Sequence, residues 1–481
     1  MFERLRELAR HSVIYGLGSV VSRILALLLL PLYTRYLQPS DYGKIETLIA
    51  LSAVVIALVS SAMKTAFFRF YFDSPEERDR LVVVRTAFWY TMTAATVCLV
   101  LGVGFAPDIS QALFGATGSA DLVRAAAVGL WAAMNYEQLT SLFRVEQRSV
   151  PFVIASLVNI FITIGATLVL VVGLDEGALG VIVGNFIGTL VVYLALLGYR
   201  RTQLGLQFDR GLFRRMTHFG LPLVPSALAL WALNFSDRFF LVKLSGPSEV
   251  GLYSIGVRIA SAMVLLLTAF RLAWPAFAYS IEDDREAKRT YSFVLTYLLF
   301  ISCWLALALG LLSPWLVRLL TTPAFYAASE VVAVLAFAAA AFGGYIVIVI
   351  AIGRSRRTQF NWVVTGLAAA LNIGLNLILI PPYGMMGAAV ATAAAYSVMF
   401  VGIAWWAQRV YPVPYQWRRV ATLGAVAVGL TVLGKALDVP LAIVVILILV
   451  YPLLLAALGF YLPAERARLR ALGRRLQVRA S

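Results

Sequence analysis

The sequence predicts an all-α polytopic membrane protein with fourteen transmembrane helices, arranged as two six-helix lobes followed by two further helices. Three observations support this prediction. Of the 481 residues, 61% are hydrophobic and only 13% are charged, which is about half the charged fraction of an average soluble protein. Long apolar runs recur along the whole chain, and two parts of the sequence repeat each other. The composition excludes a disordered chain, a collagen and an ordinary soluble enzyme.

Apolar segments account for most of the chain, and each is long enough to cross a hydrocarbon core of about 30 Å as a helix. The connections between them are short, so there is no room for a soluble domain. The predicted spans are 12–34, 43–66, 82–106, 121–143, 150–173, 178–199, 217–242, 251–277, 291–317, 326–352, 359–381, 384–407, 418–436 and 440–462.

The distribution of basic residues predicts the orientation of these spans. The even-numbered connections and both ends of the chain hold twenty-nine of the forty Lys and Arg residues, whereas the odd-numbered connections hold four. Lys and Arg are enriched in cytoplasmic loops. We therefore expect both termini to be cytoplasmic and the number of spans to be even. The net charge of +16 then reflects topology, and nucleic-acid binding is not expected.

The chain contains an internal repeat. The stretch Pro39-Ser40-Asp41-Tyr42-Gly43 follows the first span, and Pro247-Ser248-Glu249-Val250-Gly251 follows the seventh. Six spans separate the copies, so both halves have the same orientation and would be related by an axis along the membrane normal, with a site between them. Such halves favour a transporter over an intramembrane enzyme. The predicted parts are an N-lobe at 1–206, a C-lobe at 207–410, and a final helix pair with a basic tail at 411–481.

Several short motifs resemble those of bacterial oligosaccharide flippases. They are Ser22-Arg23-Ile24, Pro31 to Leu37, Asp41-Tyr42-Gly43, Phe219 to Leu223, Asp237-Arg238-Phe239, Gly251 to Ser254, Ala273-Trp274-Pro275, Asn372 to Asn376, Leu379-Ile380-Pro381 and Tyr383 to Ala389. In order and spacing, they are similar to the Wzx-like polysaccharide flippase branch of the multidrug/oligosaccharidyl-lipid/polysaccharide (MOP) exporter superfamily. The lipid II flippase MurJ is a relative of that branch. The resemblance covers spans one to twelve.

The resemblance implies a V-shaped bundle of two six-helix lobes that works by alternating access. It implies a substrate such as an undecaprenyl-diphosphate-linked oligosaccharide, moved from the inner to the outer leaflet of a bacterial or archaeal plasma membrane for surface polysaccharide biosynthesis. It implies neither a cofactor nor an enzymatic activity. Polysaccharide polymerases and glycosyltransferases are the protein partners that such a role suggests.

Basic residues inside the spans are candidates for substrate binding. An Arg or Lys at the centre of a span costs about 2.5–3.5 kcal/mol on insertion scales, so it usually faces a polar cavity or a partner. A diphosphate carries about two negative charges and offers oxygen faces that suit guanidinium groups. For Lys64 and Arg271, the alternative is that the side chain extends to the membrane interface. The residues expected to contact the diphosphate in a central cleft are Arg23, Lys64, Arg258 and Arg271.

A second group of charged residues is a candidate for coupling or gating. Glu137 could carry a coupling proton or pair with an arginine. Asp237 and Arg238 are adjacent, so on a helix they point about 100° apart and need not pair with each other. The residues in this group are Glu46, Glu137, Asp237 and Arg238.

Other functions receive less support from the sequence. No HExxH, CxxC or GxSxG motif occurs, so we expect neither catalytic residues nor a metal site. A glycan polymerase or ligase would carry charged outer loops, which are short and nearly uncharged here. A drug or cation antiporter of the same superfamily would favour buried carboxylates over buried arginines. The basic stretch from Arg466 to Arg479 is expected to lie on anionic membrane lipids.

Overall fold

The protein is helical throughout the part that the structure describes. A computed structural model describes residues 27, 29–74, 76–355, 360–463 and 465. Within these residues there is no β-strand, and ten helices are long and apolar enough to cross a membrane. The chain is therefore an all-α, multi-span membrane protein. Most of the predicted first span, 12–34, lies outside the described residues.

The helices form two compact units. The first contains the chain up to Arg258, together with Val317–Ala328 and Trp362–Ala395, and the second contains Ile259–Leu316, Ser329–Asn361 and the chain from Tyr396. These units follow the packing of the helices. The predicted lobes at 1–206 and 207–410 follow the order of the chain, and they stay a prediction.

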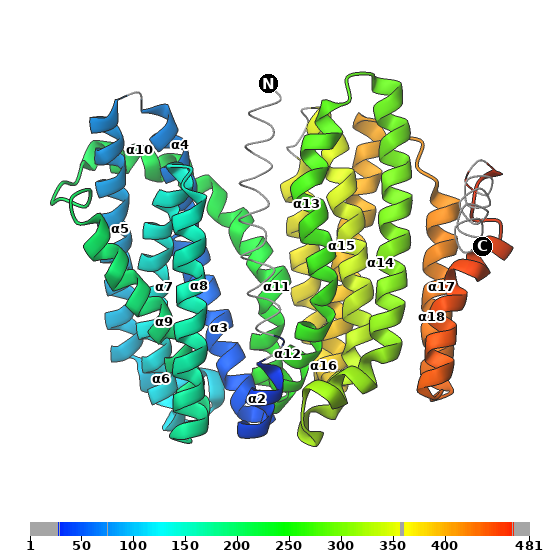
Figure 1. The fold of residues 1–481 in the computed structure, drawn as a ribbon, viewed down its shortest axis with the longest axis horizontal. Helices are drawn as coiled ribbons and strands as arrows, with labels where there is room; N and C mark the ends of the chain where they lie inside the picture. The colour runs from blue at the N-terminus through cyan, green and yellow to red at the C-terminus, as the bar shows by residue number, and fades with distance from the viewer. Residues whose placement is uncertain (1–26, 28, 75, 356–359, 464, 466–481) are drawn as a thin grey trace, which may run out of the picture. The chain divides into compact units, whose positions relative to one another are not determined.

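The first unit contains most of the helices in the N-terminal half of the chain. In it, α5, α7, α8 and α9 run side by side, and α11 packs along α3 (Figure 1). Its helices are α2 (Leu30–Tyr36), α3 (Pro39–Val59), α4 (Ser61–Asp73), α5 (Glu77–Gly104), α6 (Ala106–Phe114), α7 (Ala120–Val145), α8 (Ser149–Leu168), α9 (Gly177–Arg200), α10 (Arg210–Gly220), α11 (Val224–Leu244) and α12 (Pro247–Ala260).

The second unit contains α13 (Ala262–Ser280), α14 (Asp284–Leu320), α15 (Ser329–Arg354), the later part of α16 (Asn361–Val410), α17 (Trp417–Ala436) and α18 (Leu441–Ala457). In it, α13 packs against α15, and α17 packs against α18. The indole N–H of Trp304 on α14 donates a hydrogen bond of 2.8 Å to the carbonyl of Ile448 on α18. This bond ties the last hairpin to α14.

Local backbone chemistry divides some of the predicted spans. The span predicted at 43–66 is two helices, because α3 ends at Val59 and α4 begins at Ser61. The span predicted at 217–242 begins with the separate helix α10, followed by a 3₁₀ turn at Leu221–Leu223. Pro222 lies in that turn, where its missing N–H and fixed φ break the α-helical hydrogen-bond pattern. Apolar composition predicts the length of a span but not such breaks.

Helix α16 contains the two spans predicted at 359–381 and 384–407. Gly384 interrupts it with φ 51° and ψ −131°, a backbone conformation that glycine adopts without strain. Asn372 Nδ2 and Thr392 Oγ1 lie 3.5 Å apart, although residues 20 positions apart on a straight helix would be separated by about 30 Å. The chain therefore reverses at Gly384, and α16 is two antiparallel helices.

A carboxylate stabilises this reversal. Glu249 Oε2 accepts a hydrogen bond of 2.8 Å from the backbone N–H of Met385, at the start of the second antiparallel helix. The first N–H groups of a helix have no partner within the helix, and a negative charge near them is favourable. Glu249 belongs to the second copy of the repeated motif, and its contact with α16 is a role that the repeat did not predict.

The two copies of the repeated motif contact each other in the first unit. A Cβ atom on Gly43 would lie 1.8 Å from the carbonyl oxygen of Pro247, and a Cβ atom on Gly251 would lie 2.0 Å from the carbonyl oxygen of Pro39. Each glycine thus faces the proline at the start of the other helix. The absence of side chains at both positions lets the N-terminal turns of α3 and α12 approach to backbone contact.

Candidate functional site

Three charged side chains from three helices meet inside the first unit. Glu46 on α3 accepts a hydrogen bond of 2.9 Å from Arg258 on α12. The same carboxylate lies 3.7 Å from the guanidinium of Arg238 on α11. Glu46 is only 7% exposed and Arg238 only 6%. One buried carboxylate is therefore shared by two guanidinium groups.

The glycine contact between α3 and α12 positions this group. Glu46 lies about one helical turn after Gly43, so the close approach of the two helices brings its carboxylate within reach of Arg258. Helix α11 is held along α3 by the indole N–H of Trp231, which donates 3.1 Å to the carbonyl of Ala50. The guanidinium of Arg258 also lies 5.4 Å from the centre of the Tyr42 ring, at a distance typical of a cation–π contact.

A second carboxylate, that of Asp237, completes the network. Arg238 Nη1 lies 3.4 Å from Asp237 Oδ1 and donates a hydrogen bond of 2.9 Å to the carbonyl of Asn234, one turn earlier. The sequence had suggested that adjacent residues need not pair. They do contact here, because the long arginine side chain folds back along the helix. Tyr253 donates a hydrogen bond to the other carboxylate oxygen of Asp237.

This network, Glu46, Asp237, Arg238 and Arg258, balances two negative charges against two positive charges. Burying an ion is costly unless it is paired and hydrogen-bonded. The balance explains how four ionisable groups can share the interior of a membrane-spanning unit. It also means that both arginines are already neutralised in this conformation.

Neutral polar groups extend the network toward α16. Ser236 donates a hydrogen bond of 3.2 Å to Asn372 Oδ1, and Asn376 Nδ2 donates to the same oxygen at 3.2 Å. Thr392 lies beside Asn372 on the antiparallel part of α16 and also contacts the hydroxyl of Tyr253. Sequence reasoning missed these polar contacts. The signal was present in Asn372 and Asn376, which lie four residues apart in an apolar span and therefore share one helix face.

The carboxylate of Asp237 contacts one guanidinium, that of Arg238, and one hydroxyl, that of Tyr253. Carboxylate, amide and hydroxyl oxygens are the ligand types that hard cations prefer, and a carboxylate can also carry a proton. Within the described part of the chain, no group of three or more His, Cys, Asp or Glu side chains is close enough to hold a metal ion. The network therefore offers two carboxylates, Glu46 and Asp237, each beside an arginine.

A separate ion pair joins α4 to α7. The ammonium of Lys64 contacts the carboxylate of Glu137, and each side chain is 34% exposed. The sequence had left open whether Glu137 carries a proton or pairs with an arginine. The structure pairs it with a lysine. Because both side chains remain partly exposed, an approaching ligand could reach either charge.

The remaining predicted binding residues lie elsewhere. Arg271 is an exposed residue of α13 in the second unit. Arg23 lies outside the described residues. The first unit thus contains six of the eight predicted residues, in two groups: Glu46, Asp237, Arg238 and Arg258 in one, and Lys64 and Glu137 in the other.

One buried ion pair was not singled out from the sequence. Arg200, at the end of α9, forms two hydrogen bonds of 2.7 Å with the carboxylate of Glu146, and the Arg200 side chain is 3% exposed. In the sequence analysis this arginine is one of the twenty-nine basic residues that indicate the orientation of the spans. Glu146 also lines a polar cavity of about 270 Å³ together with Tyr71, Arg80 and Gln203. The pair fixes the loop after α7 to the end of α9.

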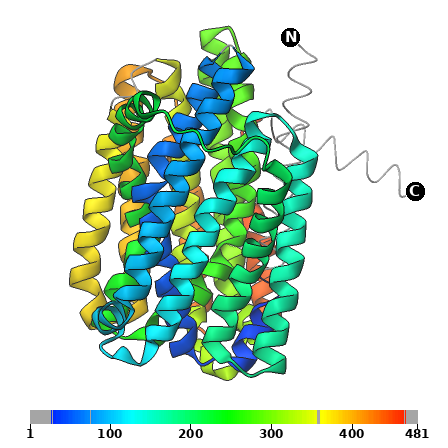
Figure 2. The same ribbon diagram turned by 90° about the vertical axis from the view of Figure 1, so that its left-hand side faces the viewer.

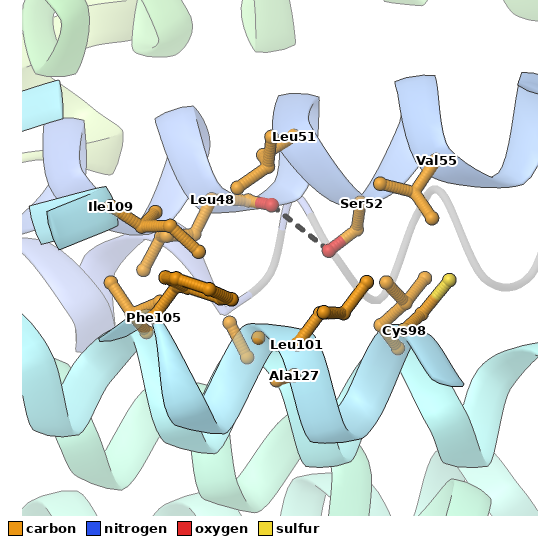
Figure 3. A pocket seen from close by; sticks show the side chains of 13 residues that line it. Leu48, Leu51, Ser52, Val55, Cys98, Leu101, Phe105, Ile109 and Ala127 are labelled. Carbon is orange, nitrogen blue, oxygen red and sulfur yellow. Dashed lines mark hydrogen bonds between the residues drawn. The ribbon is translucent and has the colours of Figure 1, made fainter. Parts of the chain in front are cut away.

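The first unit also contains an apolar pocket of about 390 Å³ between α3, α5, α6 and α7. Figure 3 shows Leu48 and Val55 on one side and Leu101, Phe105 and Cys98 on the other. The hydroxyl of Ser52 is already occupied by the carbonyl of Leu48, at 2.9 Å. A diphosphate would lose its hydration here without gaining partners, so this pocket is excluded as the site for a charged headgroup.

Comparison with known proteins identifies the family. Residues 32–330 match the model of a family described as polysaccharide biosynthesis protein. The chain belongs to this polysaccharide biosynthesis protein family. This match confirms the family resemblance that the motifs indicate.

One relative and two solved structures illustrate the likeness of this family member to known proteins. A Haemophilus influenzae protein named Lsg locus putative protein 1 is 21% identical over 304 residues, which is 58% of this chain and 67% of that protein. The lipid II flippase MurJ, in an inward closed conformation, is 13% identical with a TM-score of 0.74, covering 93% of this chain and 99% of MurJ. An inward-facing multidrug resistance MATE family transporter of the MOP superfamily is 13% identical with a TM-score of 0.69, covering 80% and 94%.

These two structures show that this polysaccharide biosynthesis protein has the MurJ- and MATE-like fold. The fold class predicted from the sequence is confirmed at this level. Since a lipid flippase and a drug transporter share the architecture, the fold alone does not distinguish their substrates. The distinction depends on the chemistry of the charged groups inside the bundle and on the family to which the chain belongs.

Proposed function

We propose that this protein is a flippase that moves a polyprenyl-diphosphate-linked oligosaccharide, such as an undecaprenyl-diphosphate-linked one, from the inner to the outer leaflet of the plasma membrane. The observation that carries the proposal is the pair of arginines, Arg238 and Arg258, sharing Glu46 inside a membrane-spanning protein of the polysaccharide biosynthesis family. Two guanidinium groups at one carboxylate match the charge and the planar oxygen faces of a diphosphate.

In this proposal the diphosphate competes with Glu46 for the arginines. Charge balance holds Arg258 against the carboxylate while no substrate is bound. An arriving diphosphate supplies the same negative charge with more acceptor oxygens, so the ion pair can exchange partners without leaving a buried charge unpaired. The exchange would separate α3 from α12, and the oligosaccharide would pass with the headgroup. The reaction moves a molecule and changes no covalent bond, so the protein is a transporter and not an enzyme.

The other predicted residues have related roles in the proposal. Lys64 contacts the headgroup after release from Glu137, and Arg23 and Arg271 extend the cationic route. Asp237 and Glu137 are the carboxylates available for a coupling proton or a gate contact. The proposal also includes the predicted topology, in which fourteen spans form two six-helix lobes and a final helix pair, and both termini are cytoplasmic in a plasma membrane. Polysaccharide polymerases and glycosyltransferases are the protein partners that it suggests.

A deletion strain tests the proposal. Without the protein, and with no second flippase present, lipid-linked oligosaccharide should accumulate in the inner leaflet and surface polysaccharide should be lost. Complementation with Arg258→Gln should fail to restore export at wild-type protein level. The matched control is Arg124→Gln, which removes an exposed arginine that pairs with Asp121 on the same helix. Unchanged polysaccharide export in the deletion strain would overturn the proposal.

A second candidate is a drug or cation antiporter. The observations that favour it are the MATE-like fold and the buried carboxylate of Asp237 among polar side chains. Dye efflux from everted vesicles under an imposed proton or sodium gradient separates the two functions. Efflux that depends on Asp237 and persists in Arg258→Gln would favour the antiporter. Absence of efflux in the wild type, together with loss of lipid flipping in Arg258→Gln, would favour the flippase.

A further inference from the structure

We propose that α10 and the linker before it form a binding surface for the headgroups of anionic phospholipids. The helix Arg210–Gly220 is amphipathic. Its buried side carries Leu212 and Met216. Its exposed positions recur every three to four residues and are mostly basic: Arg210, Arg214, Arg215 and His218.

The helix is fixed to the first unit with one side outward. Asp209 caps its start by accepting a hydrogen bond of 2.8 Å from the N–H of Leu212. Phe213 packs against Tyr90 of α5, with ring centres 5.3 Å apart. At its other end, Gly220 lies against α4, where a Cβ atom would be 2.4 Å from the carbonyl oxygen of Ala62. The exposed arginines therefore cannot turn inward without breaking this packing.

The position of α10 along the chain puts it at the edge of the hydrocarbon layer. Helix α9 ends at Arg200, and the next segment apolar enough to cross a membrane, Arg210–Leu244, is divided by the turn at Leu221–Leu223 into α10 and α11. Between α9 and α11, α10 lies crosswise to α4 and α5 (Figure 1), and it is seen nearly end-on in the perpendicular view (Figure 2). A short helix that lies crosswise between two spanning segments runs along the membrane surface.

The linker before α10 supplies the apolar half of the surface. Leu206 is 92% exposed and Phe208 is 43% exposed. Exposed apolar side chains beside a row of arginines are typical of a helix that lies in the headgroup region, with its apolar groups inserted and its cations on the phosphates. A nucleic acid or an acidic protein would satisfy the arginines but leave Leu206 in water. An anionic lipid surface satisfies both.

The experiment uses the full-length protein and a mixture of phosphatidylglycerol and phosphatidylethanolamine. Native mass spectrometry of protein released from such bilayers should show preferential retention of phosphatidylglycerol. The double variant Arg214→Gln/Arg215→Gln should lower this preference by about tenfold or more, since each basic residue near the surface contributes substantially to binding. Higher salt should weaken wild-type retention in the same direction.

A matched control removes the same charge elsewhere. Arg285 and Arg289 are exposed residues of α14 in a stretch that also contains Glu282, Asp283, Asp284 and Glu286, so Arg285→Gln/Arg289→Gln should retain phosphatidylglycerol like the wild type. Equal losses in both double variants would overturn the proposal, because the effect would then follow net charge alone. Unchanged retention in Arg214→Gln/Arg215→Gln would also overturn it.

A second measurement tests insertion of the linker independently of lipid retention. A polarity-sensitive fluorophore on Leu206→Cys, in a chain with Cys98 and Cys303 replaced by alanine, should shift to the blue when the protein is moved from zwitterionic to anionic bilayers. Arg214→Gln/Arg215→Gln should abolish the difference between the two lipids. Emission typical of water in both bilayers would show that Leu206 does not insert and would refute the proposal.

Discussion

Arg258 donates a hydrogen bond of 2.9 Å to Glu46, and this bond joins α12 to α3. The two helices begin with the two copies of the repeated motif. The bond therefore joins equivalent helices of the two sequence halves. Because Glu46 also faces Arg238, one carboxylate controls the charge balance of the whole network.

Glu46→Ala should destabilise the protein strongly. It leaves the buried Arg238 with Asp237 as its carboxylate partner and removes the Glu46 carboxylate from Arg258, and removing one partner of a buried ion pair typically costs about 3–5 kcal/mol. Thermal unfolding in detergent should show a markedly lower midpoint. Asp121→Ala is the control, because it breaks an exposed pair with Arg124 that is worth about 1 kcal/mol or less. Glu46→Gln/Arg258→Gln should recover much of the loss, and equal midpoints for Glu46→Ala and Asp121→Ala would contradict the prediction.

Gly43→Ala and Gly251→Ala should each prevent the close approach of α3 and α12. The added methyl would lie within about 2 Å of a backbone carbonyl oxygen, which cannot move aside as a flexible side chain can. We expect low yields of folded protein in membranes, measured by fluorescence-detected size exclusion. Gly104→Ala is the matched control, since a Cβ atom there has no neighbour within 4 Å and alanine is the better helix former by about 1 kcal/mol. A normal yield for Gly43→Ala would count against this packing.

Lys64→Ala should abolish flipping while leaving the protein folded, because the side chain is one third exposed and its pair with Glu137 contributes little to stability. The double variant Lys64→Ala/Glu137→Ala tests whether the lysine acts on substrate. If Lys64 contacts the diphosphate, flipping stays absent when the charge of Glu137 is also removed. Restored flipping in the double variant would mean that Lys64 serves only to neutralise Glu137.

The end of the described chain should lose stability in acid. Burial acts to raise the pKa of Glu465, but hydrogen bonds from Tyr297 and the Leu462 N–H, together with Arg419, outweigh it and leave the pKa below its usual value. A carboxyl whose folded pKa is lowered contributes stability above its unfolded pKa of about 4.3, and this contribution disappears as the pH falls through the folded pKa. Melting midpoints of wild type and Glu465→Gln should therefore differ at pH 7 and converge below about pH 4. A constant difference would refute the assignment.

Much of the fold could be predicted from the sequence. The length of each apolar segment and the positions of the arginines determine which segments can span a bilayer and in which orientation. The boundary near Gly384 is an example: the sequence placed one span on each side of it, and the chain reverses there. The break at Ser60 was not predicted, because it depends on backbone geometry and not on composition.

The sequence singled out the charged residues of the network but not their pairings, and their roles stay a prediction. Burial cost identifies Arg258 and Glu46 as residues that need partners, yet which partner each finds depends on how α3 and α12 cross. Tyr253 and Thr392 escaped notice because tyrosine and threonine are common in apolar spans. Their roles appear only when helices far apart in sequence are brought together. Arg23 remains a prediction, since it lies outside the described residues.

The reciprocal contact of Gly43 with Pro247 and of Gly251 with Pro39 has an evolutionary consequence. If the two halves arose by duplication, the ancestral motif had to pack against its own copy, as in a symmetric dimer. After fusion, neither copy could drift freely at its glycine, since any side chain there would collide with the other copy's backbone. The two halves would then have diverged at positions outside this contact between α3 and α12. Glu46 and its equivalent Ser254 are such positions, and they already differ in charge.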